Sequence, residues 1–205
     1  MAERARHLVL FLREPVPGRV KTRLGRDIGM IEACWWYRHA VRDLIRRVGR
    51  DPRWHTWLAV TPDRAVESRF WPEDLPCLPQ GGGDLGARMA RIFRTLPPGP
   101  VLIMGGDIPR AGAAHIAEAF ALLGRSDAVF GPTPDGGFWL AGLSRGRRKA
   151  PAGLFRNVRW STRHALADSL QTLGDARVSF AAPLPDIDTG LDLAMHRATG
   201  GRGGD

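Results

Sequence analysis

Short apolar runs alternate with segments of helical periodicity along this chain. Residues 8–12 (Leu-Val-Leu-Phe-Leu) form a continuous apolar run, which is typical of a strand buried on both faces of a mainly parallel sheet. The same reasoning predicts further strands at residues 54–60, 101–104, 127–131, 138–143 and 177–182.

Between these strands, apolar residues recur every three or four positions, which predicts amphipathic helices. The first helix is long, with a buried stripe made of Ile28, Ile31, Trp35, Val41, Leu44, Ile45 and Val48. Shorter helices are predicted at residues 65–71, 85–96, 113–123, 162–172 and 190–197. Repeated β-α-β units predict one three-layer α/β/α domain over residues 1–198 with a mainly parallel mixed sheet, and a flexible glycine-rich tail at residues 199–205.

The composition is that of a globular protein, with 43% hydrophobic and 25% charged residues among 205. A formal charge of +9 raises the question of nucleic-acid binding. However, Lys21 and Lys149 are the only lysines, and the arginines are spread along the whole chain. Because nucleic-acid surfaces usually show clustered basic residues, we expect small anionic partners and no nucleic acid.

Cysteine usage and hydropathy predict a cytoplasmic protein without a membrane span. Cys34 and Cys77 are far apart in the sequence and have no neighbouring ligand residues, so we expect both to be reduced core residues. No segment approaches the ~20 apolar residues that a transmembrane helix needs, and residues 1–13 lack a signal-peptide core.

Polar or glycine-rich segments follow several of the predicted strands, at the edge where open α/β sheets bind ligands. After the first strand, Arg13, Arg19, Lys21 and Arg23 place four cations close to a helix start, which suits a di- or triphosphate. A solvated arginine-rich loop explains the same residues.

A glycine run at residues 80–86 (Gln-Gly-Gly-Gly-Asp-Leu-Gly) precedes another helix. Glycines allow a ligand to approach the backbone closely, and the amide of Gln80 could read the edge of a base. A flexible connector with Asp84 as the helix N-cap is an equally simple interpretation.

Aspartates follow two further strands. Asp107 comes directly after residues 101–106 and is well placed to bind Mg²⁺ or Mn²⁺, which prefer oxygen ligands. The alternative is that it caps the next helix. Asp186 and Asp188 alternate in an extended segment, so only one should face the site. We choose Asp188, because it is nearer the start of the next helix. A divalent cation would remove the repulsion between it and Asp107.

Asp135, Gly136 and Gly137 form the fourth polar segment. The carboxylate of Asp135 could accept a hydroxyl proton from an acceptor that the two glycines allow to come close. An ordinary Asp-Gly turn is the alternative. Trp160, Ser161 and Thr162 precede a later helix and could belong to the site. Core packing of Trp160 and helix capping by Ser161 or Thr162 would explain them equally well.

Taken in order, these motifs resemble a known family. The motifs are residues 11–24 (Phe-Leu-Arg-Glu-Pro-Val-Pro-Gly-Arg-Val-Lys-Thr-Arg-Leu), 80–89 (Gln-Gly-Gly-Gly-Asp-Leu-Gly-Ala-Arg-Met), 105–109 (Gly-Gly-Asp-Ile-Pro), 131–138 (Gly-Pro-Thr-Pro-Asp-Gly-Gly-Phe), 160–162 (Trp-Ser-Thr) and 186–189 (Asp-Ile-Asp-Thr). Together they resemble the bacterial GT-A-type enzymes called radical-SAM/selenodomain-associated transferases, which are similar to the wider nucleotide-diphospho-sugar transferase superfamily.

This resemblance implies a GT-A fold and a role for each motif. The nucleotide phosphates would lie over Arg13, Arg19, Lys21 and Arg23, the base near Gln80 and Gly86, and an Mg²⁺ or Mn²⁺ ion between Asp107 and Asp188. The acceptor would lie near Asp135, Gly136, Gly137 and Trp160, and catalysis would depend on Lys21, Arg23, Asp107 and Asp135.

The chain departs from this family at two positions. Arg13 replaces a lysine after the first strand, and Thr189-Gly-Leu-Asp-Leu193 replaces the common Thr-Pro-Glu-Asp-Leu. Since glycine replaces the helix-starting proline, we expect a looser helix start beside Asp188.

We therefore predict a metal-dependent transferase that uses a nucleotide-activated donor and a small-molecule acceptor. Glycosyl transfer from a nucleotide-diphospho-sugar is favoured, because the first loop lacks the glycine-rich triphosphate signature of the nucleotidyltransferases. Nucleotidyl transfer with release of pyrophosphate is the first alternative, and a non-catalytic nucleotide-binding protein is the second.

Overall fold

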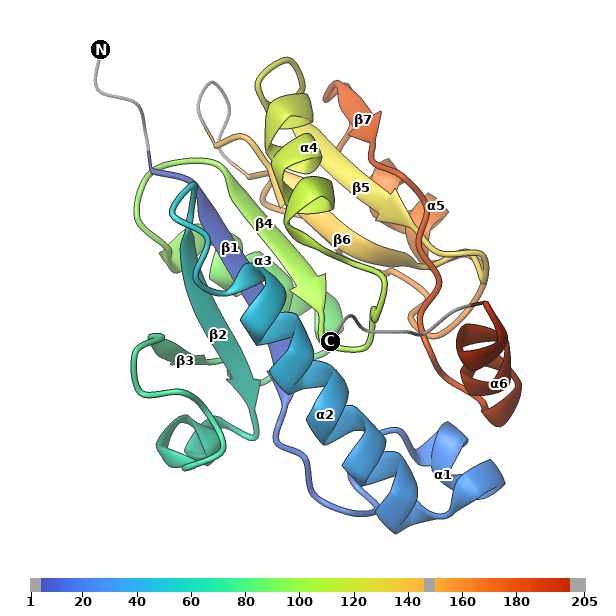
Figure 1. Ribbon diagram of the computed structural model, residues 1–205. Coiled ribbons are helices and arrows are strands. Elements are labelled where there is room, and N and C mark those ends of the chain that lie inside the picture. Colours follow the sequence, from blue (N-terminus) through green and yellow to red (C-terminus); the bar gives the residue numbers. More distant parts are fainter. Residues whose placement is uncertain (1–4, 146–149, 200–205) are drawn as a thin grey trace.

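A mixed β-sheet forms the centre of the protein (Figure 1). In this computed structural model, which describes residues 5–145 and 150–199, the sheet has seven strands in the order β3-β2-β1-β4-β6-β5-β7. Their bounds are β1 His7–Arg13, β2 His55–Thr61, β3 Cys77–Pro79, β4 Val101–Gly105, β5 Ala128–Pro132, β6 Phe138–Leu143 and β7 Val178–Phe180. Strand β6 is antiparallel to β4 and β5, and the other neighbouring strands are parallel.

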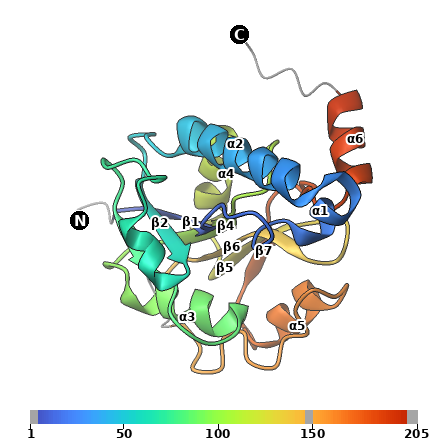
Figure 2. The same cartoon turned by 90° about the horizontal axis from the view of Figure 1, so that it is seen from below.

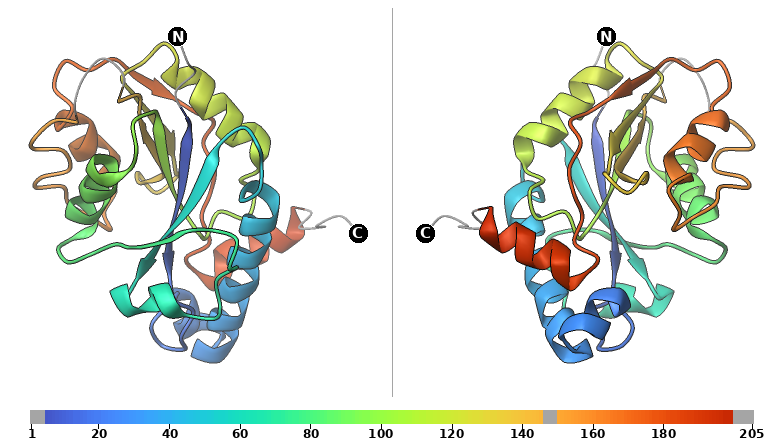
Figure 3. Two further views of the ribbon diagram at one scale, coloured as in Figure 1. Left: turned by 90° about the vertical axis from the view of Figure 1, so that its left-hand side faces the viewer. Right: turned by 90° about the vertical axis from the view of Figure 1, so that its right-hand side faces the viewer.

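Helices cover both faces of this sheet. They are α1 Thr22–Ile28, α2 Met30–Val48, α3 Leu85–Thr95, α4 Ala113–Leu123, α5 Ala165–Gln171 and α6 Gly190–Ala198, with a 3₁₀ helix η1 at Asp63–Glu67. Figure 2 shows α2 and α4 on one face and α3 and α5 on the other, with α1 and α6 beside one end of α2. Figure 3 shows the same layers from the two sides. The predicted three-layer fold is confirmed.

The period-2 alternation of the strands divides the core into two layers. In β1, Leu8, Leu10 and Leu12 belong to the cluster that includes Val41 of α2. Val9, which points the other way, packs in a second cluster with Phe93 of α3 and Phe130 of β5. Both faces of β1 are therefore buried, as its continuous apolar run predicts.

Two predicted helices differ from the structure. The helix predicted at residues 65–71 is replaced by the 3₁₀ helix η1, which ends at Glu67, and the long first helix is interrupted. Gly29, with φ 96°, separates α1 from α2, and the predicted stripe is wrong at Ile31 and Trp35, which are 59% and 57% exposed. The reason is the helical spacing. Trp35 lies six positions before Val41, so the two side chains are roughly 120° apart around the helix axis and point to different faces. The buried face instead continues through Cys34 and Tyr37.

Residues 1–4, 146–149 and 200–205 lie outside the described residues, so most of the predicted tail at 199–205 is not described, although Thr199 caps α6. Within the described ranges, no helix combines the length and the apolarity that crossing a bilayer requires.

The strand directions bring four loops to one edge of the sheet. Strands β1 and β4 are parallel and end at this edge, whereas the antiparallel β6 begins there. The segment after β7 runs on beside β5 to the same edge, with Ala181 N donating to Phe130 O at 2.8 Å and Leu184 N to Pro132 O at 3.2 Å. The loops after β1, β4 and β5 and the segment before α6 therefore meet.

Two tryptophan variants, one on α2 and one between α2 and β2, test which of these side chains packs in the core. Trp35→Ala should change the free energy of unfolding by no more than about 0.5 kcal/mol, because the side chain is largely exposed. Trp54→Ala should cost about 3–5 kcal/mol, because Trp54 is 6% exposed and its indole donates to Val48 O. Urea denaturation measures both. Equal losses of unfolding free energy would contradict the burial assigned to these two side chains.

Candidate functional site

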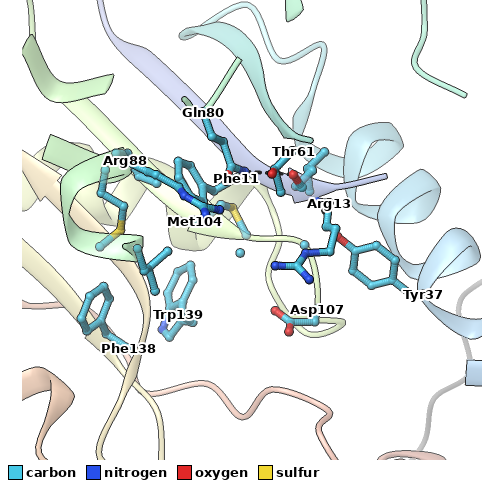
Figure 4. Close-up of a pocket in the computed structure, with 16 residues that line it drawn as sticks. Phe11, Arg13, Tyr37, Thr61, Gln80, Arg88, Met104, Asp107, Phe138 and Trp139 are labelled. Atoms are coloured by element: carbon cyan, nitrogen blue, oxygen red, sulfur yellow. Dashed lines mark hydrogen bonds between the residues drawn. The ribbon is translucent and has the colours of Figure 1, made fainter. Parts of the chain in front are cut away.

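Two neighbouring cavities lie at this edge of the sheet. The first has a volume of about 450 Å³ and lies between β1, β4, β6 and the start of α3. Figure 4 shows several of its lining side chains, among them Phe11, Gln80, Arg88, Met104, Phe138 and Trp139. The second, of about 420 Å³, is lined by the cationic loop after β1 together with Ser161 and Asp188. Arg13, Tyr37 and Asp107 line both cavities.

Three carboxylates meet beside the second cavity. One oxygen of each of Asp107, Asp186 and Asp188 lies within 4.8 Å of the others. The prediction that Asp186 and Asp188 point to opposite sides is therefore wrong. Residues 181–188 are not paired as a regular strand, so the alternation of a pleated strand does not apply to them.

The ammonium of Lys21 lies between two of these carboxylates. Its Nζ is 2.5 Å from Oδ2 of Asp107 and 2.6 Å from Oδ1 of Asp188, and its side chain is only 7% exposed. Arg23 contacts the other oxygen of Asp188 at 3.1 Å from a more exposed position. The backbone of Lys21 is left-handed (φ 46°, ψ 46°) immediately before α1.

Burial and charge shift the pKa values of this cluster in opposite directions. Burial and the neighbouring carboxylates raise the pKa of Asp186 to about 6. Burial acts in the same direction on Asp188, but Lys21 and Arg23 outweigh it and lower the pKa of Asp188. Burial alone would lower the pKa of Lys21, yet Asp107 and Asp188 raise it.

The donor set fits a divalent metal ion. It consists of carboxylate oxygens, the ligands that Mg²⁺ and Mn²⁺ prefer, and three of them, from Asp107, Asp186 and Asp188, lie close enough together to share one ion. The alternative role of Asp107 as a helix cap is not what the structure has, because Gly112 is the N-cap residue of α4.

The helix start beside Asp188 is closely held, contrary to the expectation from Gly190. Thr189 and Asp192 form a capping box at the start of α6, and Asp192 Oδ2 also accepts from the amide of Asp188 at 3.1 Å. The amide of Gly190 donates to Asp27 of α1 at 2.7 Å. These bonds replace the constraint that a proline would supply.

The amide of Gln80 is fixed by the sheet. Gln80 is 2% exposed, and its Nε2 donates to the carbonyls of Leu12 and Ala59, each at 2.9 Å. Because both amide hydrogens are used, only Oε1 can bind a ligand in the first cavity, as an acceptor.

Packing and capping explain the rest of this glycine segment. A Cβ on Gly86 would lie 2.7 Å from Phe155 and 2.9 Å from Trp160, so Gly86 allows α3 to approach that loop. Asp84 caps α3 by accepting from Ala87 N at 2.8 Å, as the alternative interpretation of this segment predicts.

The segment after β5 forms a closed turn. Oδ1 of Asp135 accepts from Thr133 Oγ1 at 2.5 Å and from Gly137 N at 3.0 Å. Gly136 has φ 87° and lies against the backbone of Arg163, where a Cβ would be 2.3 Å from the carbonyl oxygen. The Asp-Gly turn is thus present, and Oδ2 of Asp135 is the oxygen left to meet an acceptor.

Trp160 belongs mainly to the core beneath this turn. Its ring packs against Phe138 and Phe155, with centroids 6.1 Å and 6.0 Å away. Its buried Nε1 has no hydrogen-bond partner among the described residues. The next residue, Ser161, lines the second cavity. Trp160 therefore contributes to the site by packing next to a residue that lines it.

Tyr37 was not predicted as a site residue. It is the only tyrosine of the chain, and its hydroxyl accepts from Arg13 N at 3.0 Å while the side chain lines both cavities. Burial raises its pKa to about 12, so the hydroxyl stays protonated. In the sequence Tyr37 looks like any other residue on the buried face of a helix, and only its being the sole tyrosine could have drawn attention to it.

The fold and this site define a class of protein. The structure is similar to a proposed nucleotide-diphospho-sugar transferase from Desulfovibrio desulfuricans G20, with 25% identity, a TM-score of 0.85 and coverage of 97% of this chain and 89% of that chain. The chain therefore has the fold of the nucleotide-diphospho-sugar transferases, and the predicted class is confirmed.

More distant structures share the fold. One is 4-diphosphocytidyl-2C-methyl-D-erythritol synthase from Anaerococcus prevotii DSM 20548, with 12% identity, a TM-score of 0.64 and coverage of 95% and 97% of the two chains. Another is Rv0371C from Mycobacterium tuberculosis H37Rv in complex with manganese, with 18% identity, a TM-score of 0.52 and coverage of 95% and 98%.

The family follows from the sequence. Residues 44–162 match the family described as uncharacterized protein conserved in bacteria (DUF2064), and the chain belongs to this family. The match ends before the segment of Asp186 and Asp188 and begins after the cationic loop. No curated protein matches the chain.

The loop that carries Trp160 and Ser161 is held by an ion pair whose pH dependence can be measured. Arg159 donates to Asp168 of α5 through Nε and Nη2, each at 2.8 Å, and through its backbone amide at 3.0 Å. These bonds lower the pKa of Asp168. A group with a depressed folded-state pKa adds stability above its unfolded pKa and loses it as the pH falls.

We therefore expect Asp168→Asn to unfold more easily than the wild type at pH 7. The difference in unfolding free energy should shrink as the pH falls below about 4, where the unfolded carboxyl becomes protonated. Urea titrations between pH 7 and pH 3 measure this. Asp74→Asn, which removes the exposed pair with Arg50, is the control with a smaller effect. A difference that stays constant with pH would contradict the role of Asp168.

Proposed function

We propose that this protein is a metal-dependent transferase that moves a glycosyl group from a nucleotide-diphospho-sugar to a small acceptor. The observation that carries the proposal is the acidic cluster of Asp107, Asp186 and Asp188 beside the second, cationic cavity, which shares lining residues with the first cavity and its apolar walls. Volumes of about 450 and 420 Å³ are in the range of ligand pockets.

The cationic cavity suits the diphosphate of the donor. Arg13, Arg19, Lys21 and Arg23 line it, and a diphosphate is the class of ligand whose charge they would balance. In glycosyl transfer, the sugar–phosphate bond breaks and its electron pair stays on the leaving nucleoside diphosphate. Lys21 and Arg23 would stabilise that developing charge, which is the main electrostatic contribution available to the protein here.

A divalent ion would supply a Lewis acid for the same phosphate oxygens. Asp107 and Asp188 would hold Mg²⁺ or Mn²⁺, and Asp186 adds a third carboxylate within reach. A structure of similar fold contains manganese, which supports the choice of ion.

The first cavity suits the nucleoside part of the donor. Phe11, Met104 and Phe138 give it apolar and aromatic surface for a base, and Oε1 of Gln80 could accept a hydrogen bond from a base N–H. Gly86 would shape this cavity through packing. The acceptor would lie near Oδ2 of Asp135, beside Gly136 and Gly137.

Nucleotidyl transfer, with release of pyrophosphate from a nucleoside triphosphate, is the second candidate. A similar fold occurs in 4-diphosphocytidyl-2C-methyl-D-erythritol synthase. We favour glycosyl transfer because the loop after β1 lacks a glycine-rich triphosphate signature and because the similarity to the proposed sugar transferase is greater, with a TM-score of 0.85 against 0.64.

Thermal unfolding with a panel of nucleotides and nucleotide-sugars tests the donor site. With Mn²⁺ present, the correct donor at ~100 times its Kd should stabilise the protein by about 2.7 kcal/mol, which raises the melting temperature by roughly 5–10 °C for this size. Asp107→Ala should lose the metal-dependent part of the shift. Asp74→Ala should keep it, because that carboxylate pairs with Arg50 and lines neither cavity.

The products distinguish the two reactions. Once a donor is found, release of a nucleoside diphosphate from a nucleotide-sugar identifies glycosyl transfer, and release of pyrophosphate from a triphosphate identifies nucleotidyl transfer. If the donor binds but neither product forms with any acceptor, the protein is a nucleotide-binding protein. If no nucleotide shifts the melting temperature in any metal, the donor site is wrong.

A further inference from the structure

Lys21 occupies the position that a metal ion would take. Its Nζ lies within 2.6 Å of oxygens from both Asp107 and Asp188, and those two oxygens belong to the residues of the candidate metal cluster. An ammonium that hydrogen-bonds to one oxygen of each carboxylate competes with a metal ion for those two oxygens.

The same lysine is the best placed cation for the phosphates. It lines the cationic cavity together with Arg13, Arg19 and Arg23. Because the lysine side chain is a flexible stem with a compact charge, rotation about its side-chain bonds would move Nζ from the carboxylates into this cavity.

We propose that Lys21 is an exchangeable internal cation: it holds Asp107 and Asp188 together in the empty protein and is displaced into the phosphate cavity when a divalent ion binds. The proposal rests on the proposed function for the identity of the site, and it adds an order of events. Metal binding releases the lysine that the diphosphate needs, so metal and diphosphate should assist each other.

The exchange should lower the affinity for a free divalent ion, and this effect can be measured by adding the ion to the protein without a nucleotide. A metal ion must break two charge-assisted hydrogen bonds before it binds. Lys21 therefore lowers the affinity for a free divalent ion, although it would raise the affinity for a metal–diphosphate complex. A lysine that served only to bind phosphate would have no such effect on the free ion.

The experiment is a titration of the full chain with Mn²⁺ alone, followed by electron paramagnetic resonance of the free ion. Lys21→Met should bind Mn²⁺ about tenfold more tightly than the wild type, because the two contacts no longer have to be broken. Arg23→Met is the matched control. Arg23 contacts one oxygen of Asp188 from a 58% exposed position, so it should change the affinity by less than about threefold.

Lysine labelling tests the displacement in the unmodified chain. The chain has two lysines, so reductive methylation read by mass spectrometry reports Lys21 with Lys149 as the internal reference. Lys21 is 7% exposed in its ion pairs and should react slowly. Saturating Mn²⁺ should increase its labelling relative to Lys149, and Mn²⁺ with inorganic pyrophosphate should reduce it again.

Each result has a defined meaning. Tighter Mn²⁺ binding by Lys21→Met and faster labelling of Lys21 with Mn²⁺ support the exchange. Unchanged or weaker binding by Lys21→Met, or labelling that Mn²⁺ does not alter, would overturn it while leaving the donor site intact. If neither wild type nor Lys21→Met binds Mn²⁺, both the exchange and the proposed metal site are wrong. If Lys21→Met does not fold, the labelling experiment on the unmodified chain alone decides between these outcomes.

Discussion

The ion pairs of Lys21 with Asp107 and Asp188 join three parts of the chain that are far apart in sequence. They connect the loop after β1, the loop after β4 and the segment before α6. Two carboxylates at this distance repel each other, and burial increases the cost of their charge. A buried cation between them is what allows these loops to meet. The geometry of both cavities therefore depends on a positive charge at this point.

The sheet topology and a helix cap determine which aspartates reach that charge. Because β1 and β4 are parallel, their carboxyl ends deliver Lys21 and Asp107 to one edge. Asp188 comes from the segment before α6. Its backbone amide donates a hydrogen bond to Asp192, a member of the capping box at the start of that helix. The position of Asp188 is thus fixed by α6 as well as by Lys21. Gly190 is tolerated because these bonds define the helix start without proline.

The sequence predicts features that depend on local pattern and fails where tertiary contacts decide. Continuous apolar runs identify β1 and β4, and polar residues after them identify Lys21 and Asp107, because strand ends gather at one edge. The alternation rule places Asp186 on the wrong side because it holds only in a paired strand. The prediction for Trp35 fails because its spacing from Val41 places it on a different face of α2. Gln80 can offer a base only its carbonyl oxygen, because its two amide hydrogens bond to carbonyls of β1 and β2, a tertiary contact that the sequence does not show.

The choice of lysine at position 21 is itself informative. Of the 30 basic residues in this chain, only Lys21 and Lys149 are lysines, so arginine is the default cation of this sequence. A guanidinium is a planar fork that binds one carboxylate through two nitrogens. It would not fit as a single point between oxygens of two different aspartates, as the ammonium does at 2.5 and 2.6 Å. A spherical metal ion makes the same geometric demand. The residue best able to stand in for a metal ion, and to yield its place to one, is therefore the residue found there.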